Sequence, residues 1–208
     1  TMALPVALLL GGVIAFAHPV RDFPVENEQQ IAPGVTMPLL NLGGMSSRPS
    51  NWSLFFSLGG RGVDSALSYG EDQQRNLGRE IAQTPVPRSE IFVTTKIPCC
   101  PYPNPLCDSD WSNATVNTEN VMRELGLGYV DLILVHWECP NINDTLAAYQ
   151  SLLPMLDKGT ARAVGVSNFR GETIDFIVEQ TGVKPAVNQL GLFVGITPDA
   201  DASIDYAI

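Results

Sequence analysis

Hydrophobic residues in this chain form short continuous runs that alternate with segments in which they recur every three or four positions. The run from Leu132 to Val135 is apolar at every position, which is typical of a parallel strand covered on both faces. Ile174, Ile177 and Val178 instead keep the spacing of one helix face. Together these patterns predict strands at residues 62–65, 91–96, 130–136, 161–166 and 186–189, and helices at 72–83, 118–126, 145–158 and 172–181.

Strands that alternate with helices at this spacing predict an α/β fold built from parallel β/α units. Before them, residues 31–44 place a Pro-Gly turn between two apolar stretches, which indicates extended structure entering a first core strand. Residues 98–117 are rich in Pro, Asn and Ser and predict a long loop. We expect Pro154 to disturb the helix predicted around it.

The amino-terminal residues 2–17 contain no charged side chain. Three interpretations stay open: a retained membrane anchor, a removable signal peptide ending in Ala15-Phe16-Ala17, and a buried helix of a soluble protein. We expect an apolar helix at 1–18 that contacts lipid through residues 2–17, a polar linker at 19–30, and a single domain at 31–208.

Bulk composition narrows the class of protein. With 45% hydrophobic and 16% charged residues the chain can bury a core, so wholesale disorder is excluded. A net charge of −10 argues against nucleic acid as a partner. The four cysteines show no metal-ligand spacing, and we expect no metal site.

The cysteines instead suggest a disulfide. Cys99, Cys100 and Cys107 follow one predicted strand and Cys139 follows the next, so Cys139 can reach one of the three; free thiols are the alternative. Three Asn-x-Ser/Thr sequons, together with the apolar amino terminus, favour a lumenal or secretory-route domain.

Polar residues stand where the predicted parallel strands end. The carboxyl ends of barrel strands gather around one mouth, where such folds perform chemistry. One such residue alone is usually just solvated, but a series on successive strands predicts a site. Its members are Asp64 with Tyr69 just beyond it, Lys96, His136, Ser167 with Asn168, and Gln189.

These residues lie in motifs that resemble the successive signatures of the aldo-keto reductase family. The motifs are Asp64-x-Ala-x-x-Tyr69-Gly, Thr95-Lys96, His136-Trp137, Gly165-Val-Ser-Asn-Phe169 and Pro185-Ala-Val-Asn-Gln189. Their order and spacing agree with the family over about 160 residues. The resemblance implies a parallel (β/α) barrel of TIM type, here incomplete, with about six of eight β/α units.

The resemblance also implies roles for these residues. Asp64, Tyr69, Lys96 and His136 are the expected catalytic set, in which Tyr69 donates a proton, Asp64 holds Lys96, and His136 orients a carbonyl oxygen. We expect the Lys96 ammonium to favour the Tyr69 phenolate. The cofactor implied is NADPH, with its carboxamide held by Ser167, Asn168 and Gln189, and Trp137 is expected to line the substrate pocket.

The sequence also departs from the family pattern. Gly43-Gly44-Met45 replaces a Gly-Thr pair, and Leu190-Gly-Leu-Phe193 follows Gln189. The chain reaches Ile208 without the two further strands, the aromatic that stacks on nicotinamide, or the Lys-Ser…Arg segment that binds the adenosine phosphate. We therefore expect an open barrel edge and weakened binding of NADPH.

Three candidate functions follow from these features. The first is a non-catalytic, membrane-anchored accessory subunit of a larger complex, photosynthetic or respiratory, that packs on partner subunits through the open barrel edge and the amino-terminal helix. The alternative is an active NAD(P)H-dependent reductase of aldehydes or ketones, and a secreted binding domain is a third option. We expect a membrane-associated domain on a lumenal side, in an organelle such as the thylakoid or on the secretory route, with a soluble secreted or lumenal protein as the alternative.

Overall fold

The computed structural model describes residues 27–45, 50–99 and 113–191. Its centre is a six-stranded parallel sheet in which the strands follow one another in chain order, from β3 to β8. The strands are β3 (Asn41–Gly43), β4 (Gly62–Asp64), β5 (Phe92–Ile97), β6 (Val130–Val135), β7 (Ala161–Ser167) and β8 (Asn188–Gln189). This sequential parallel order is that of a TIM-type barrel, and the described strands form an incomplete one, as predicted.

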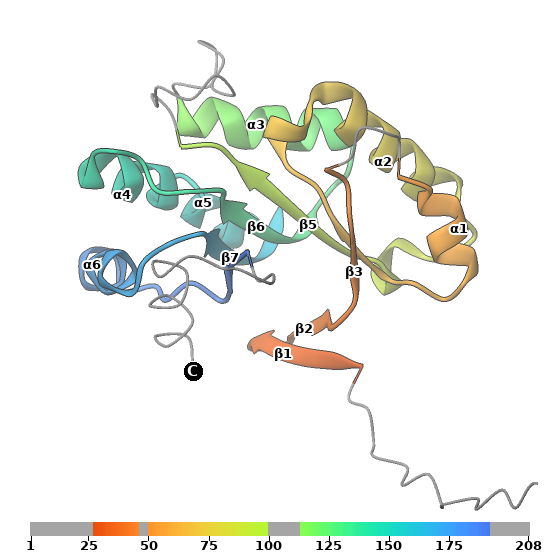
Figure 1. Ribbon diagram of the computed structural model, residues 1–208, viewed down its shortest axis with the longest axis horizontal. Helices are drawn as coiled ribbons and strands as arrows, with labels where there is room; N and C mark the ends of the chain where they lie inside the picture. Colours follow the sequence, from red (N-terminus) through yellow and green to blue (C-terminus); the bar gives the residue numbers. More distant parts are fainter. Residues whose placement is uncertain (1–26, 46–49, 100–112, 192–208) are drawn as a thin grey trace, which may run out of the picture.

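Helices connect consecutive strands and cover the outer side of the curved sheet (Figure 1). In chain order they are α1 (Trp52–Ser57), α2 (Glu71–Gln83), α3 (Ala114–Leu125), α4 (Ile142–Gln150), α5 (Leu153–Asp157) and α6 (Gly171–Thr181). Short 3₁₀ turns, η1 (Leu67–Tyr69) and η2 (Arg88–Glu90), flank α2. Each crossover therefore leaves one face of the sheet against helices and the other face turned inward.

Side-chain alternation along the strands divides the core in two. Val93, Ile133 and Val164 belong to the larger cluster, which packs against the helices. Their neighbours one position along, including Leu132 and Leu134, belong to a smaller inner cluster. Because strand side chains alternate between faces, every second residue of β5, β6 and β7 points into the barrel.

A β-hairpin contributes to this inner cluster. β1 (Glu28–Ala32) and β2 (Val35–Pro38) pair antiparallel as a separate two-stranded sheet, drawn apart from the barrel strands in Figure 1. Val35 packs with inward residues of β5 and β6, and Arg162 Nη2 donates to the Gly34 carbonyl at 2.9 Å. The hairpin therefore packs against the inner face of the barrel.

One predicted boundary near the amino terminus differs from the structure. Residues 28–30, assigned to the linker, lie in β1, because pairing with β2 recruits polar positions that carry no hydrophobic pattern. Within residues 31–44, the predicted extended stretches on either side of the Pro-Gly turn are the end of β1 and β2, and they lead into the short strand β3, as predicted. The predicted apolar helix at 1–18 lies outside the described residues.

Helix boundaries differ from prediction where capping and proline act. α3 starts at Ala114, inside the predicted loop, because the Asn113 side chain accepts hydrogen bonds from the backbone N–H groups of Thr115 and Val116. The predicted helix at 145–158 is two helices, since Pro154 cannot continue the hydrogen bonding of α4 and stands in the first turn of α5.

A disulfide joins Cys99 to Cys139, with Cα atoms 5.3 Å apart. It links the segments that follow β5 and β6, so the prediction that Cys139 is bridged is confirmed and its partner is Cys99. Cys100 and Cys107 lie outside the described residues. Among the described helices, none combines the length and apolarity needed to cross a membrane.

Candidate active site

The strand ends bring the predicted site residues to one end of the barrel. Lys96 lies on the inward-facing register of β5, two positions beyond Thr94, and His136 follows β6 two positions beyond Leu134. The His136 backbone N–H donates to the Ile97 carbonyl at 2.9 Å, and Ser167 pairs in register with Gln189. Parallel registration therefore places these residues, with Asp64 at the end of β4, around one mouth.

A buried ion pair forms the centre of the site. The Lys96 side chain is 1% exposed and its Nζ donates to Asp64 Oδ1 and, at 3.2 Å, to the Ser65 carbonyl. The same Nζ lies 3.3 Å from the Tyr69 hydroxyl oxygen. Lys96 thus joins the carboxylate of Asp64 to the phenol of Tyr69, as the sequence predicted.

The protonation of Tyr69 differs from the expectation. Burial and the nearby Asp64 carboxylate raise the pKa of Tyr69 from 10.0 to about 12. Burial also lowers the pKa of Lys96, against the opposing effect of Asp64. The pKa of Tyr69 therefore moves opposite to the direction expected from Lys96, and Tyr69 is a protonated phenol at neutral pH.

His136 stands next to Tyr69, with the ring centroids 5.7 Å apart in an edge-on arrangement. Its Nδ1 lies 3.0 Å from the Ser68 hydroxyl oxygen. Burial, followed by the positive charge of Lys96, lowers the pKa of His136 from 6.5 to about 3. The imidazole is therefore neutral at the pH values at which proteins normally act.

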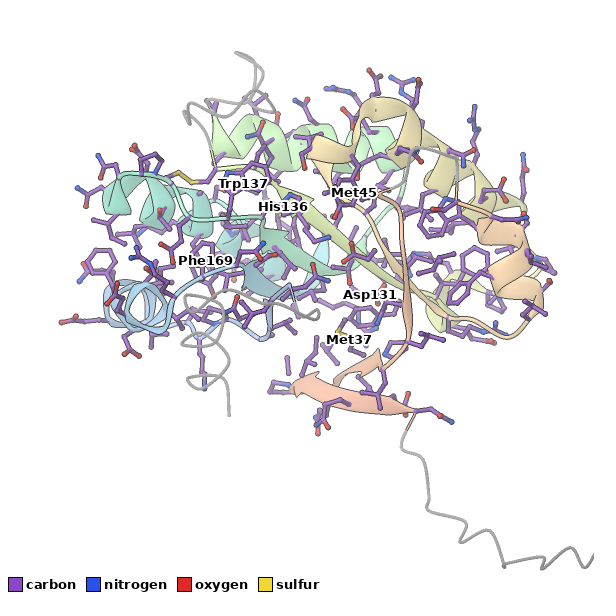
Figure 2. All side chains as sticks on the ribbon, viewed as in Figure 1. Met37, Met45, Asp131, His136, Trp137 and Phe169 are labelled. Atoms are coloured by element: carbon purple, nitrogen blue, oxygen red, sulfur yellow. A yellow bond between two sulfur atoms is a disulfide. The ribbon has the colours of Figure 1, made fainter. Side chains whose placement is uncertain are left out.

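Trp137 is stacked beside His136 at the same end of the sheet, where Figure 2 shows the two labelled side chains together. The indole Nε1 donates to the Cys99 carbonyl at 3.2 Å. Cys99 is in turn held by the disulfide to Cys139, so the bridge and the indole belong to one wall of the site.

The three residues expected to hold a nicotinamide carboxamide also lie side by side. Asn168 Nδ2 donates to the Ser167 hydroxyl at 2.9 Å and to the His136 carbonyl at 3.2 Å. The Ser167 hydroxyl donates to the Gln189 carbonyl at 3.0 Å. Asn168 has φ of 58°, a left-handed conformation that asparagine tolerates better than most residues and that turns the chain at this strand end.

Gln189 makes a contact that the sequence did not suggest. Its Nε2 donates to Asp64 Oδ2 at 2.9 Å, which ties β8 to the ion pair of β4 and β5. A carboxamide offers one acceptor oxygen and two donor hydrogens. Among the described residues, Asn168 Oδ1 and Gln189 Oε1 have no hydrogen bond and can accept, and the second Nε2 hydrogen of Gln189 can donate. These groups fit a nicotinamide carboxamide.

Sequence reasoning did not single out Ser68. It occupies a variable position of the Asp64-x-Ala-x-x-Tyr69 motif, directly before the tyrosine. The only signal in the sequence was its place on the same predicted turn as Tyr69. Its contact is with His136, which lies 68 residues further along the chain. Such a pairing depends on the curvature of the barrel, which no local pattern encodes.

Comparisons with known proteins agree with this geometry. The model of the aldo/keto reductase family matches residues 52–194. An aldo-keto reductase of Mycolicibacterium paratuberculosis is 35% identical over 161 residues, which cover 76% of this chain and 54% of that protein. The chain thus spans about half the length of the curated relatives it matches.

Solved structures give the same result. An aldo-keto reductase from a Medee basin deep-sea metagenome library superposes with a TM-score of 0.68 at 28% identity, covering 82% of this chain and 60% of that one. An aldo-keto reductase of Bombyx mori, solved in complex with NADP, gives a TM-score of 0.60 at 26% identity, covering 79% and 58%. With the family model matching more than half of the residues and the same side chains gathered at one barrel mouth, this chain belongs to the aldo/keto reductase family.

Proposed function

We propose that this chain carries the catalytic centre of an NAD(P)H-dependent reductase of aldehydes or ketones. The observation that carries this proposal is the contact between Lys96 Nζ and the Tyr69 hydroxyl, with Asp64 behind the lysine and His136 beside the tyrosine. The curated relatives are named aldo-keto reductases, which favours this function over the accessory role expected from the apolar amino terminus.

Tyr69 would supply the proton. Its pKa of about 12 keeps the hydroxyl protonated at neutral pH, so it is ready to act as an acid toward a carbonyl oxygen. As that proton leaves, negative charge develops on the phenol oxygen 3.3 Å from Lys96 Nζ. The ammonium then stabilises the developing phenolate, and Asp64 keeps the ammonium charged and in position.

His136 would orient the substrate. A neutral imidazole carries one N–H donor, which can hydrogen-bond the carbonyl oxygen and fix its distance from the Tyr69 hydroxyl. Trp137, stacked on His136 and anchored to the Cys99 carbonyl, would form a wall of the carbonyl pocket.

Ser167, Asn168 and Gln189 would hold the carboxamide of a nicotinamide ring and so select one face of the ring. When bound, the reduced nicotinamide supplies the hydride that forms the new C–H bond of the product alcohol. A related Bombyx mori enzyme was solved with NADP, which supports NADPH as the partner to test first.

The disulfide bears on where the protein works. Disulfides persist in oxidising compartments and are rare in reducing ones. The Cys99–Cys139 bridge therefore supports our proposal of a lumenal or secretory-route location.

Replacing Tyr69 tests the proposed chemistry. The full chain is assayed for loss of nicotinamide absorbance with NADPH and a panel of aliphatic and aromatic aldehydes and ketones. Tyr69→Phe removes only the hydroxyl, so we expect kcat to fall by about 10²- to 10⁴-fold.

Tyr129→Phe is the matched control, because Tyr129 packs against Arg88 at the start of β6, away from the strand ends that form the site. It should retain the wild-type rate. Turnover by Tyr69→Phe at the wild-type rate, or no turnover of any carbonyl by the wild type at saturating NADPH, would overturn the proposed function.

A further inference from the structure

Ser68 and His136 make a hydrogen bond that links two loops of the site. The Ser68 hydroxyl oxygen lies 3.0 Å from Nδ1 of His136, and both side chains are half-buried. Within residues 27–45, 50–99 and 113–191, neither the Ser68 hydroxyl nor the His136 ring has another hydrogen bond. Ser68 is therefore the protein group that faces Nδ1.

The backbone around Ser68 holds it in place. Ser68 is the middle residue of η1, where the Tyr69 N–H donates to the Ala66 carbonyl at 3.0 Å. Gly70 follows with φ of 101°, a left-handed conformation that lets α2 start immediately after the turn. The same turn therefore presents Tyr69 and Ser68 to His136 together.

The state of the imidazole makes this contact consequential. His136 is neutral because burial and the charge of Lys96 depress its pKa. A neutral imidazole has one proton, on Nδ1 or on Nε2, and the nitrogen without it accepts. Only the form protonated on Nε2 leaves Nδ1 as an acceptor for the Ser68 hydroxyl and Nε2 as a donor for a substrate.

We propose that Ser68 is a positioning residue that donates its hydroxyl proton to Nδ1 of His136 and thereby keeps the neutral imidazole in its Nε2-protonated form. If the roles were reversed, no acceptor in the described part of the chain would face the Ser68 hydroxyl proton, which would then depend on solvent for its hydrogen bond. The consequence for carbonyl binding rests on the proposed function, whereas the protonation state of His136 does not.

Nitrogen NMR of labelled histidine tests the proposal on the free protein. The chain has only two histidines, His18 and His136, so a His18→Gln background leaves a single imidazole to observe. We expect one neutral form, with Nε2 protonated and Nδ1 bare. Detection of the proton on Nδ1 in this protein would overturn the proposal without any further variant.

Variants of Ser68 extend the test. Ser68→Ala should convert the single form into a mixture of the two tautomers, whereas Ser68→Thr keeps a hydroxyl and should retain the wild-type spectrum. Ser65→Ala is the matched control, because the buried Ser65 hydroxyl lies in the same strand-end segment and has no partner among the described residues. An unchanged spectrum in Ser68→Ala, or the same change in Ser65→Ala, would contradict the assignment.

Kinetics separate this proposal from the proposed function. Because the donor matters most as charge develops on the carbonyl oxygen, we expect Ser68→Ala to lower kcat about 5- to 10-fold while KM changes less than about twofold. Ser68→Thr should restore kcat. If the wild type reduces no carbonyl, the proposed function fails, yet the NMR result still decides the role of Ser68.

Discussion

The buried ion pair of Lys96 and Asp64 carries a cost in desolvation free energy. An ammonium that is 1% exposed loses most of its hydration, and its ion pair with Asp64 offsets that loss only because the geometry is close and Ser65 adds a further hydrogen bond. A hydrophobic pair of similar volume at such positions is often neutral or stabilising. The pair is therefore explained better by the proposed chemistry at Tyr69 than by stability.

His136 gives a residue-scale prediction for the dependence of stability on pH. Its pKa is about 3 when folded and 6.5 when unfolded, so the unfolded state binds the proton first as the pH falls. The stabilising contribution of neutral His136 is fully present above about pH 6.5 and is lost as the pH falls from there toward 3. His136→Gln should remove this loss. The number of protons taken up on unfolding, which sets the slope of unfolding free energy against pH, should fall by about one in this range.

Urea unfolding at a series of pH values measures this effect. The comparison is the difference between wild type and His136→Gln, because carboxylates titrate in both proteins and their contribution cancels. Parallel curves for the two proteins across this range would show that the pKa of His136 is the same in the folded and unfolded states.

At the scale of elements, helices α2 and α3 approach each other through a glycine. A Cβ placed on Gly78 would lie 1.9 Å from the carbonyl oxygen of Leu125, which is backbone and cannot rotate away. Alanine would gain about 1 kcal/mol in helix propensity, but the clash forces the two helices apart. The close approach of the two helices therefore makes the net effect of alanine on stability unfavourable.

We expect Gly78→Ala to lower the free energy of unfolding by about 1–3 kcal/mol, as measured by chemical denaturation. Gly128→Ala is a suitable control, since a Cβ there meets nothing within 4 Å and the residue is exposed. A Gly78→Ala protein as stable as the wild type would mean that α2 and α3 are less closely packed than described.

At the scale of the whole molecule, contacts distant in sequence join the parts of the incomplete barrel. Gln189 reaches Asp64 across 125 residues, and Arg162 ties the hairpin to β7 through Gly34. Asp131, labelled in Figure 2, accepts from both Arg88 and Arg162 at the start of β6. These links brace both ends of the sheet, one beside the site and one away from it.

The disulfide is the covalent link among them, and its removal yields a prediction. Cys99 and Cys139 are 40 residues apart in the sequence. For a loop of this length, loss of the cross-link typically costs about 2–4 kcal/mol of stability. The Cys99→Ala/Cys139→Ala variant avoids burying a new hydroxyl. Its free energy of unfolding, measured with urea, should be lower by that amount. Trp137 fluorescence should shift as well, because its indole is anchored to the Cys99 carbonyl.

Peptide mapping of the unreduced wild type provides the control, and it should recover the Cys99 and Cys139 peptides linked to each other. Recovery of Cys139 linked to Cys100 or Cys107 would contradict the observed pairing. Equal stability of the double variant and the wild type would show that the bridge does not constrain the unfolded chain.

Much of the fold could be read from the sequence because its signals are local. The continuous apolar run of β6 and the helical spacing of α6 identify the β/α units, and the motifs that end at Lys96, His136 and Gln189 identify the family. Local capping at Asn113 was also present in the sequence, although hydrophobic pattern alone placed the start of α3 too late.

The sequence by itself thus determined the α/β class, the strands that end in polar residues, and the candidate site. Only the tertiary structure decided which cysteine Cys139 joins, that Ser68 faces His136, and that Gln189 bonds Asp64. Likewise, burial and the nearby Asp64 carboxylate raise the pKa of Tyr69, and both are properties of the packed barrel. Periodicity is encoded within a few residues, whereas these contacts and their electrostatics depend on strand register and sheet curvature across the whole domain.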